Sequence, residues 1–136
     1  MDFSLTLAVN DLHETDTFYR RILNLSPEWG PTCPGTSPFL VLRCSQLFVV
    51  FRTISDLECC HPALLQNLTR HPLGVGLQLE FGFTDLDAIL GNLRRQQWPI
   101  CYELEDDEHR RKEIWLHDPD GYLLILNEEN AEPKTG

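Results

Sequence analysis

An internal repeat constrains the fold more than any other feature of this sequence. The segment Leu7–Leu12 reads Leu-Ala-Val-Asn-Asp-Leu, and the segment Phe81–Leu86, 74 residues later, reads Phe-Gly-Phe-Thr-Asp-Leu. Both copies start as an alternating apolar stretch, typical of a half-buried strand, and then enter a helical stretch near an aspartate. Any two strand–helix units share some likeness, but here strand, cap and helix all keep the same register. The repeat therefore predicts two successive modules with the same opening.

The hydrophobic pattern predicts the remaining elements of each module. The first module is expected to contain a strand at 4–10, a helix from Asp11, a loop with room for a short strand at 25–38, and strands at 39–43 and 47–53. The second is expected to contain a strand at 77–84, a helix capped by Thr84 or Asp85 and ending near Gln97, and strands at 99–104, 112–117 and 122–127.

The chain as a whole is predicted to be an α+β domain of two tandem βαβββ modules over residues 1–130. The first module spans about 2–56 and the second about 74–129. A connector at 57–73 joins them, with a short helix expected at 62–68 because Pro62 suits a first helical turn. Residues 131–136 are expected to form a flexible tail.

Charge and hydropathy exclude several classes of partner. The chain carries 21 acidic and 11 basic residues, for a net charge of −10. Nucleic acid is not expected, because a duplex-binding surface needs clustered Lys and Arg. No stretch reaches the roughly 20 apolar residues that span a bilayer, and the N-terminus lacks the pattern of a signal peptide. We therefore expect no membrane partner and a cytoplasmic location, with the five cysteines reduced.

Two motifs of the chain resemble one protein family. Leu7–Leu12 and the following Phe-Tyr-Arg-Arg-Ile-Leu-Asn-Leu at Phe18–Leu25 are similar to the opening of the vicinal oxygen chelate superfamily. This superfamily includes glyoxalases, bleomycin-resistance proteins and extradiol dioxygenases. The Asp-Pro-Asp-Gly turn at Asp118–Gly121, with its flanking strands, resembles the family's final hairpin. The resemblance covers Phe3 to Glu129 and implies curved mixed sheets, each with its helix on the convex side, and a cleft between modules.

The resemblance also implies positions for metal ligands. Family members that use a metal place one ligand on the first strand of each module and an acid on the last strand. Those positions hold Ser4, Gln78 and Ile125, and a residue among Val49, Val50 and Phe51. Divalent metals prefer imidazole, carboxylate or thiolate donors. We therefore expect no metal and no cofactor at this site.

The same strands supply the candidate ligand-binding residues. With period-two alternation, several side chains are expected to face the cleft: Ser4, Thr6, Phe51, Gln78, Glu80, Trp115, Leu123 and Ile125. Trp115 is equally compatible with packing under a helix, and Glu80 with a solvated sheet face. If the protein is an enzyme, Glu80 is the candidate catalytic base.

Three functions fit this sequence. The leading hypothesis is a metal-free protein that binds and sequesters a small molecule, similar to bleomycin-resistance proteins. The alternative is a metal-dependent lyase, isomerase or dioxygenase with shifted ligands such as Gln78, Glu80 and His117. A third is a sensor in which Cys59 and Cys60, beside His61, respond to a metalloid or to oxidation, although chance clustering explains these three residues as well. The family architecture further implies a homodimer.

Overall fold

The computed structural model describes residues 1–30 and 37–128, so the expected tail at 131–136 lies outside the described residues. Its internal contacts divide the chain into two compact units, Met1–Leu73 and Gly74–Gly136, and each is described by itself. No helix in the described residues is long and apolar enough to cross a membrane.

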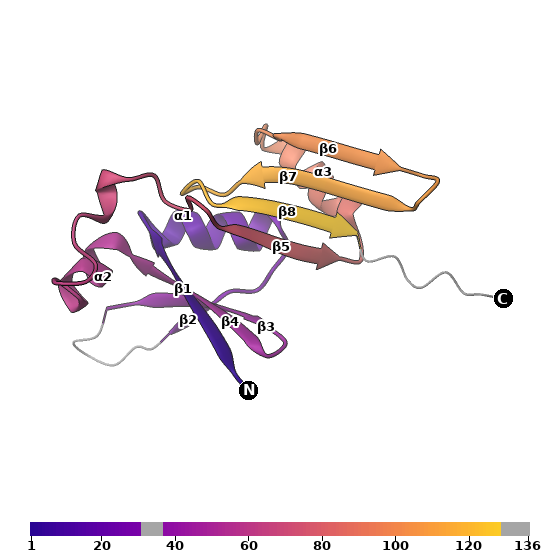
Figure 1. The fold of residues 1–136 in the computed structure, drawn as a ribbon. Coiled ribbons are helices and arrows are strands. Elements are labelled where there is room, and N and C mark those ends of the chain that lie inside the picture. Colours follow the sequence, from indigo (N-terminus) through magenta and orange to yellow (C-terminus); the bar gives the residue numbers. More distant parts are fainter. Residues whose placement is uncertain (31–36, 129–136) are drawn as a thin grey trace. The chain divides into compact units, whose positions relative to one another are not determined.

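The first unit is a four-stranded mixed sheet with a helical segment on one face (Figure 1). The strands are β1 (Phe3–Val9), β2 (Glu28–Gly30), β3 (Phe39–Cys44) and β4 (Leu47–Thr53). Strand β1 pairs in parallel with β4, while β4–β3 and β3–β2 are antiparallel, giving the order β1-β4-β3-β2. The helical segments are α1 (Leu12–Thr17), the π-helical turn η1 (Phe18–Ile22), α2 (Ile54–Cys60) and the 3₁₀ turn η2 (Leu68–Arg70).

The core of the first unit lies between the sheet and the α1–η1 segment. The ring centroid of Tyr19 on η1 lies 5.0 Å from that of Phe51 on β4, and both side chains are fully buried. The strands add Leu7, Val9, Leu40, Leu42 and Val49 to this core. Phe51, which the sequence placed on the ligand-facing side, is therefore a core residue. Its strand neighbours Val50 and Arg52 point to the other face of the sheet, because side chains alternate along a strand.

The structure does not contain the helix expected at 62–68; the α-helix of this segment is α2, which lies earlier in the chain. Helix α2 begins at Ile54, directly after β4, because the Thr53 hydroxyl accepts a hydrogen bond from the Asp56 N–H at 3.1 Å. The helix ends at Cys60, so Pro62 follows it instead of starting it.

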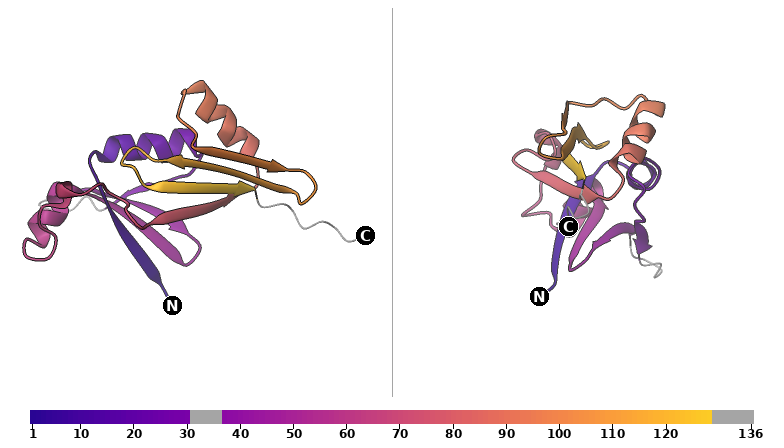
Figure 2. Two further views of the ribbon diagram at one scale, coloured as in Figure 1. Left: turned by 45° about the horizontal axis from the view of Figure 1, so that its top comes forward. Right: turned by 90° about the vertical axis from the view of Figure 1, so that its right-hand side faces the viewer.

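The second unit repeats this architecture. Its strands are β5 (Gln78–Phe83), β6 (Tyr102–Asp106), β7 (Arg111–His117) and β8 (Leu123–Glu128). The sheet has the order β5-β8-β7-β6, with β5 parallel to β8 and the other pairs antiparallel. Helix α3 (Leu86–Arg95) lies on one face of this sheet (Figure 2). Its buried side chains are Leu86, Ile89, Leu90 and Leu93. The shared order and pairing confirm two βαβββ modules.

The Asp-Pro-Asp-Gly turn between β7 and β8 is built around a buried carboxylate. Asp118 is only 4% exposed, and its Oδ1 accepts hydrogen bonds from the backbone N–H groups of Asp120 at 2.9 Å and Tyr122 at 3.0 Å. Gly121 adopts a φ of 98°, which favours glycine. The turn sets where β8 begins and so fixes which of its side chains face each side of the sheet.

Candidate functional site

The face of the second sheet opposite α3 gathers most of the candidate residues. Pairing across the sheet places Glu80, Ile125, Trp115 and Tyr102 in one row, and Gln78, Leu123 and His117 in the adjacent row. We call this surface the helix-free face; it comprises Gln78, Glu80, Tyr102, Glu113, Trp115, His117, Leu123, Ile125 and Asn127. The structure thus brings together the five candidates of the second module, and it orients Trp115 away from α3.

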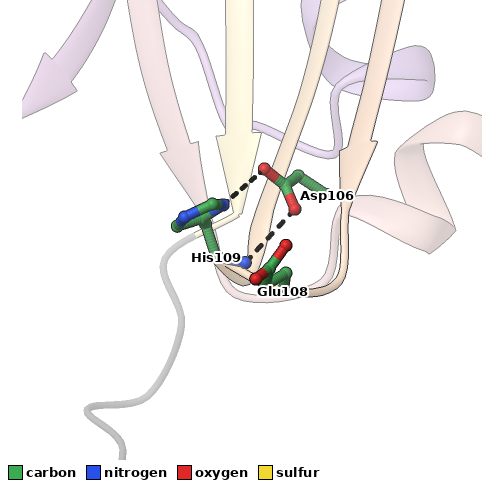
Figure 3. A group of neighbouring side chains, drawn as sticks. All are labelled: Asp106, Glu108 and His109. Carbon is green, nitrogen blue, oxygen red and sulfur yellow. Dashed lines mark hydrogen bonds and ion pairs between the residues drawn. The ribbon is translucent and has the colours of Figure 1, made fainter.

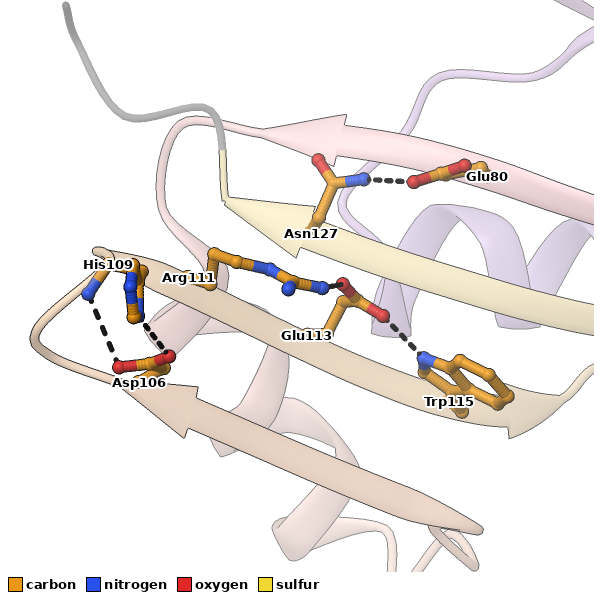
Figure 4. A network of polar contacts seen from close by, with 7 residues as sticks. All are labelled: Glu80, Asp106, His109, Arg111, Glu113, Trp115 and Asn127. Carbon is orange, nitrogen blue, oxygen red and sulfur yellow. Dashed lines mark hydrogen bonds and ion pairs between the residues drawn. The ribbon is translucent and has the colours of Figure 1, made fainter.

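Hydrogen bonds hold the acidic groups of this face in place (Figure 4). The Asn127 amide donates to Glu80 Oε1 at 2.8 Å. The Glu113 carboxylate accepts from the Trp115 indole N–H at 2.7 Å and from the Arg111 guanidinium at 3.1 Å. The indole N–H, followed by the guanidinium, holds the pKa of Glu113 below its usual range. Glu113 is therefore ionised at neutral pH and fixes the orientation of the indole.

Two aromatic rings and two aliphatic side chains form the apolar part of the helix-free face. The rings of Trp115 and Tyr102 meet edge to face, with centroids 5.4 Å apart. Tyr102 is half exposed, whereas Ile125 is buried and Leu123 half-buried. A flat apolar group can stack or pack on such a surface, and the ionised carboxylates beside it favour neutral or cationic groups.

The first sheet presents Ser4 and Thr6 on the face away from α1. Register places Ser4 beside Phe48 and Thr6 beside Val50, so both candidate side chains adjoin apolar ones. Near them, Arg52 stacks over the Phe39 ring at 4.3 Å. Arg52 also pairs with Asp56 of α2 at 3.4 Å.

A pocket of about 410 Å³ opens beside this pair and is lined by Thr6, Arg52, Leu57, Cys60, His61 and Leu65. Sequence reasoning included only Thr6 of these residues as a ligand-binding candidate. It placed Phe51 on this face and located the neighbouring helix too late in the chain. The sequence signal for the earlier helix is Thr53, a residue type favoured at helix N-caps, and the Arg52–Asp56 pair supports it.

Strand register identifies the residues at the metal-ligand positions that the resemblance implies. In the second module, Glu80 pairs with Ile125; in the first, Thr6, the repeat equivalent of Glu80, pairs with Val50. Val50 is therefore the counterpart of Ile125, and the four positions hold Ser4, Val50, Gln78 and Ile125. Two aliphatic side chains, one hydroxyl and one amide do not make the donor set of a divalent metal. These residues do not fit the metal that the fold family implies.

Glu80 and His117, two of the shifted metal ligands that the enzyme hypothesis requires, have other partners. Glu80 is bonded to Asn127, and the His117 Nδ1 lies 3.4 Å from the Cys101 Sγ. In the described part of the chain, one group of three His, Cys, Asp or Glu side chains brings its ligand atoms within 4.8 Å of one another: Asp106, Glu108 and His109 (Figure 3). It contains none of the shifted ligands.

The Asp106–Glu108–His109 group closes the β6–β7 hairpin. The Asp106 carboxylate accepts from the His109 N–H at 3.2 Å and contacts the His109 ring Nδ1 at 2.8 Å. The side-chain hydrogen bond with His109 lowers the pKa of Asp106. Its exposed position and these turn contacts explain the cluster as a hairpin cap.

Cys59 and Cys60 lie exposed at the end of α2, followed by His61. Cys60 Sγ contacts Asp56 at 3.9 Å, and Cys60 and His61 both line the pocket of the first unit. The three residues do not form a close group of metal-ligating atoms in the described structure.

Comparison with known proteins gives a result at the level of fold. The sequence matches no protein-family model and no curated protein. Many solved structures match the fold. A glyoxalase/bleomycin resistance protein/dioxygenase superfamily member from Sphaerobacter thermophilus has a TM-score of 0.64 and 18% identity, over 95% of this chain and 97% of that one.

Two structures with named functions match similarly. A lactoylglutathione lyase from Agrobacterium tumefaciens has a TM-score of 0.59 and 18% identity, over 94% of this chain and 92% of that one. The fosfomycin resistance protein FosX from Listeria monocytogenes has a TM-score of 0.62 and 15% identity, over 97% and 93%. The pairing of strands within each module and these matches lead to one conclusion: the chain has the fold of the glyoxalase/bleomycin resistance/dioxygenase superfamily.

Proposed function

We propose that this chain is a binding protein that sequesters a small molecule and holds no metal of its own. The observation that carries the proposal is the pair of aliphatic residues, Val50 and Ile125, at the positions where metal-dependent members place acids. The lyase and resistance functions of the structural relatives belong to those proteins. A binding role needs only a shaped surface with fixed polar groups, and the helix-free face supplies one.

The helix-free face favours a ligand with a flat apolar part and a neutral or cationic polar part. Trp115 and Tyr102 provide aromatic area, while Glu80 and Glu113 provide negative charge that Asn127, Arg111 and the indole hold in place. Because these intramolecular contacts already fix the side chains, little ordering is needed on binding, which favours affinity.

Fluorescence titration tests this with two flat aromatic probes of opposite charge. Ethidium, a cation, is expected to bind more tightly than anilinonaphthalene sulfonate, an anion. Trp115→Ala should weaken ethidium binding about tenfold, since one aromatic contact contributes about 1 kcal/mol beyond its buried area. Trp29→Ala is the matched control, because Trp29 lies on β2 in the other unit.

Glu80→Gln separates charge from shape in the same titration. The amide oxygen of glutamine can still accept from Asn127, so the surface is kept while one negative charge is removed. We expect ethidium affinity to fall and anilinonaphthalene sulfonate affinity to rise or stay unchanged. Equal ethidium affinity in the wild type, Trp115→Ala and Glu80→Gln would show that the helix-free face is not the binding site.

A further inference from the structure

A cysteine and a histidine meet at one end of the second sheet. Cys101 directly precedes β6, His117 ends β7, and the Cys101 Sγ lies 3.4 Å from the His117 Nδ1. Both residues are exposed. The contact does not depend on the ligand proposed above.

Hydrogen bonds to the backbone groups of Cys101 and His117 fix both partners of this contact. The Cys101 N–H donates to the Trp115 carbonyl at 2.8 Å, and the Trp98 indole N–H donates to the His117 carbonyl at 2.9 Å. The two side chains therefore leave neighbouring, well-anchored backbone segments, which favours a persistent thiol–imidazole contact. A nucleophile within hydrogen-bond reach of a base is the usual arrangement of an activated thiol.

The other described cysteines lack this arrangement. Burial raises the pKa of the Cys44 thiol, which disfavours its thiolate. The Cys60 Sγ contacts the Asp56 carboxylate at 3.9 Å, and a carboxylate replaces the imidazole that Cys101 contacts. Cys59 is exposed and sits in α2, and Cys33 lies outside the described residues.

We propose that Cys101 and His117 form a nucleophilic pair that is modified by soft electrophiles, namely small molecules with a carbon–carbon double bond conjugated to a carbonyl. The His117 Nδ1 takes the proton of the thiol, and the sulfur electron pair forms a bond to the β-carbon. The π electrons of the double bond move onto the α-carbon and carbonyl, and the resulting enolate takes a proton at the α-carbon from the imidazolium. The net reaction adds S–H across the double bond and consumes no oxidant or reductant.

Competitive modification of the full-length chain tests the pair, with acrylamide as the probe. Samples quenched over time are digested, and the modified fraction of each cysteine is measured by mass spectrometry. Cys101 is expected to react about tenfold faster than Cys59 and Cys60, since a positioned base contributes a factor of this order or more. The half-buried Cys44 is expected to react more slowly still. His117→Gln should reduce the Cys101 rate to about that of Cys59. His109→Gln, which removes another exposed histidine of the same unit, should leave it unchanged.

The half-buried Cys44 reports whether each variant stays folded, because unfolding would raise its rate. If Cys44 becomes reactive in His117→Gln, His117→Asn replaces it. Two results would overturn the proposal. One is a Cys101 rate in the wild type no higher than that of Cys59, which needs no variant at all. The other is a Cys101 rate unchanged in a folded His117 variant, which would mean that exposure alone sets its reactivity.

Discussion

Single residues decide what the helix-free face can bind, and Glu113 shows how. This carboxylate joins Arg111 to the indole of Trp115, so it orients the largest apolar group of the face. The Asn127 amide fixes the Glu80 carboxylate in the same way, through its hydrogen bond. The polar residues here fix the positions of the groups that we expect to contact a ligand.

The lowered pKa of Glu113 predicts a specific pH dependence of stability. Because its folded pKa lies below the ordinary value of 4.5, ionised Glu113 stabilises the fold fully above that pH. This contribution is lost as the pH falls through the folded pKa. The difference in unfolding free energy between wild type and Glu113→Gln should therefore be constant near neutral pH and shrink below pH 4.5. Urea titrations at several pH values measure it. A difference between wild type and Glu113→Gln that does not change with pH would contradict the assignment.

Asp118 is predicted to be a stability residue of the Asp-Pro-Asp-Gly turn. Asp118→Ala should lower the free energy of unfolding by about 3 kcal/mol, because two backbone N–H groups lose a charged acceptor and that of Tyr122 is buried. Asp118→Asn, which keeps one acceptor oxygen, should cost less. Urea denaturation checks both, with the loop residue Asp107 changed to Ala as the control, expected within about 0.5 kcal/mol of wild type. A loss for Asp118→Ala no larger than the control's would contradict this role.

The sequence predicted residue facings well wherever apolar and polar residues alternate. Gln78 and Glu80 alternate with Leu79 and Phe81, and the structure places them on opposite faces. The sequence predicted the wrong facing for Phe51 because β4 begins Leu-Phe-Val-Val-Phe, an unbroken apolar run. Without polar residues in alternation, such a run does not show which side chains face the core. Trp115, flanked by Ile114 and Leu116, stayed ambiguous for the same reason.

At the scale of elements, the repeat is expressed in equivalent helix caps. The Asp11 carboxylate accepts from the His13 and Glu14 N–H groups at 2.8 and 3.3 Å, and the Asp85 carboxylate accepts from the Ala88 N–H at 3.2 Å. The aspartate at the same position of each repeat therefore caps the helix that follows it. Both helices were predictable from the sequence because cap and apolar stripe agree.

Removing either cap should destabilise its own module by a similar amount. Asp11→Ala and Asp85→Ala should each cost about 1 kcal/mol in unfolding free energy, and Asp→Asn at either position much less. Thermal and urea unfolding measure these effects. If one position proves neutral while the other does not, the two caps are not equivalent.

Helix α2 was mispredicted because two start signals compete in this segment. Pro62 suits a first helical turn, but Thr53 caps a helix eight residues earlier, and the Arg52–Asp56 pair supports it. The α2 residues that line the pocket of the first unit were therefore not recognised as site candidates. Local sequence signals alone do not decide which of the two helix starts is used. The packing of Leu57 into the core favours the start at Ile54.

At the scale of the whole molecule, the homodimer remains a prediction. Sedimentation velocity is expected to give twice the chain mass of 15.7 kDa. The mass of a single chain at micromolar concentration would contradict it.

Metal analysis of the purified chain tests whether it holds an ion of its own. The chain is to be expressed in medium supplemented with iron, nickel, zinc and manganese, purified without chelator or affinity tag, and measured by native mass spectrometry and elemental analysis. With Ser4, Val50, Gln78 and Ile125 at the implied ligand positions, we expect far less than one ion per chain. One equivalent of a single metal that survives gel filtration, and is lost in a Gln78→Ala or Glu80→Ala variant, would show instead that these strands hold a metal.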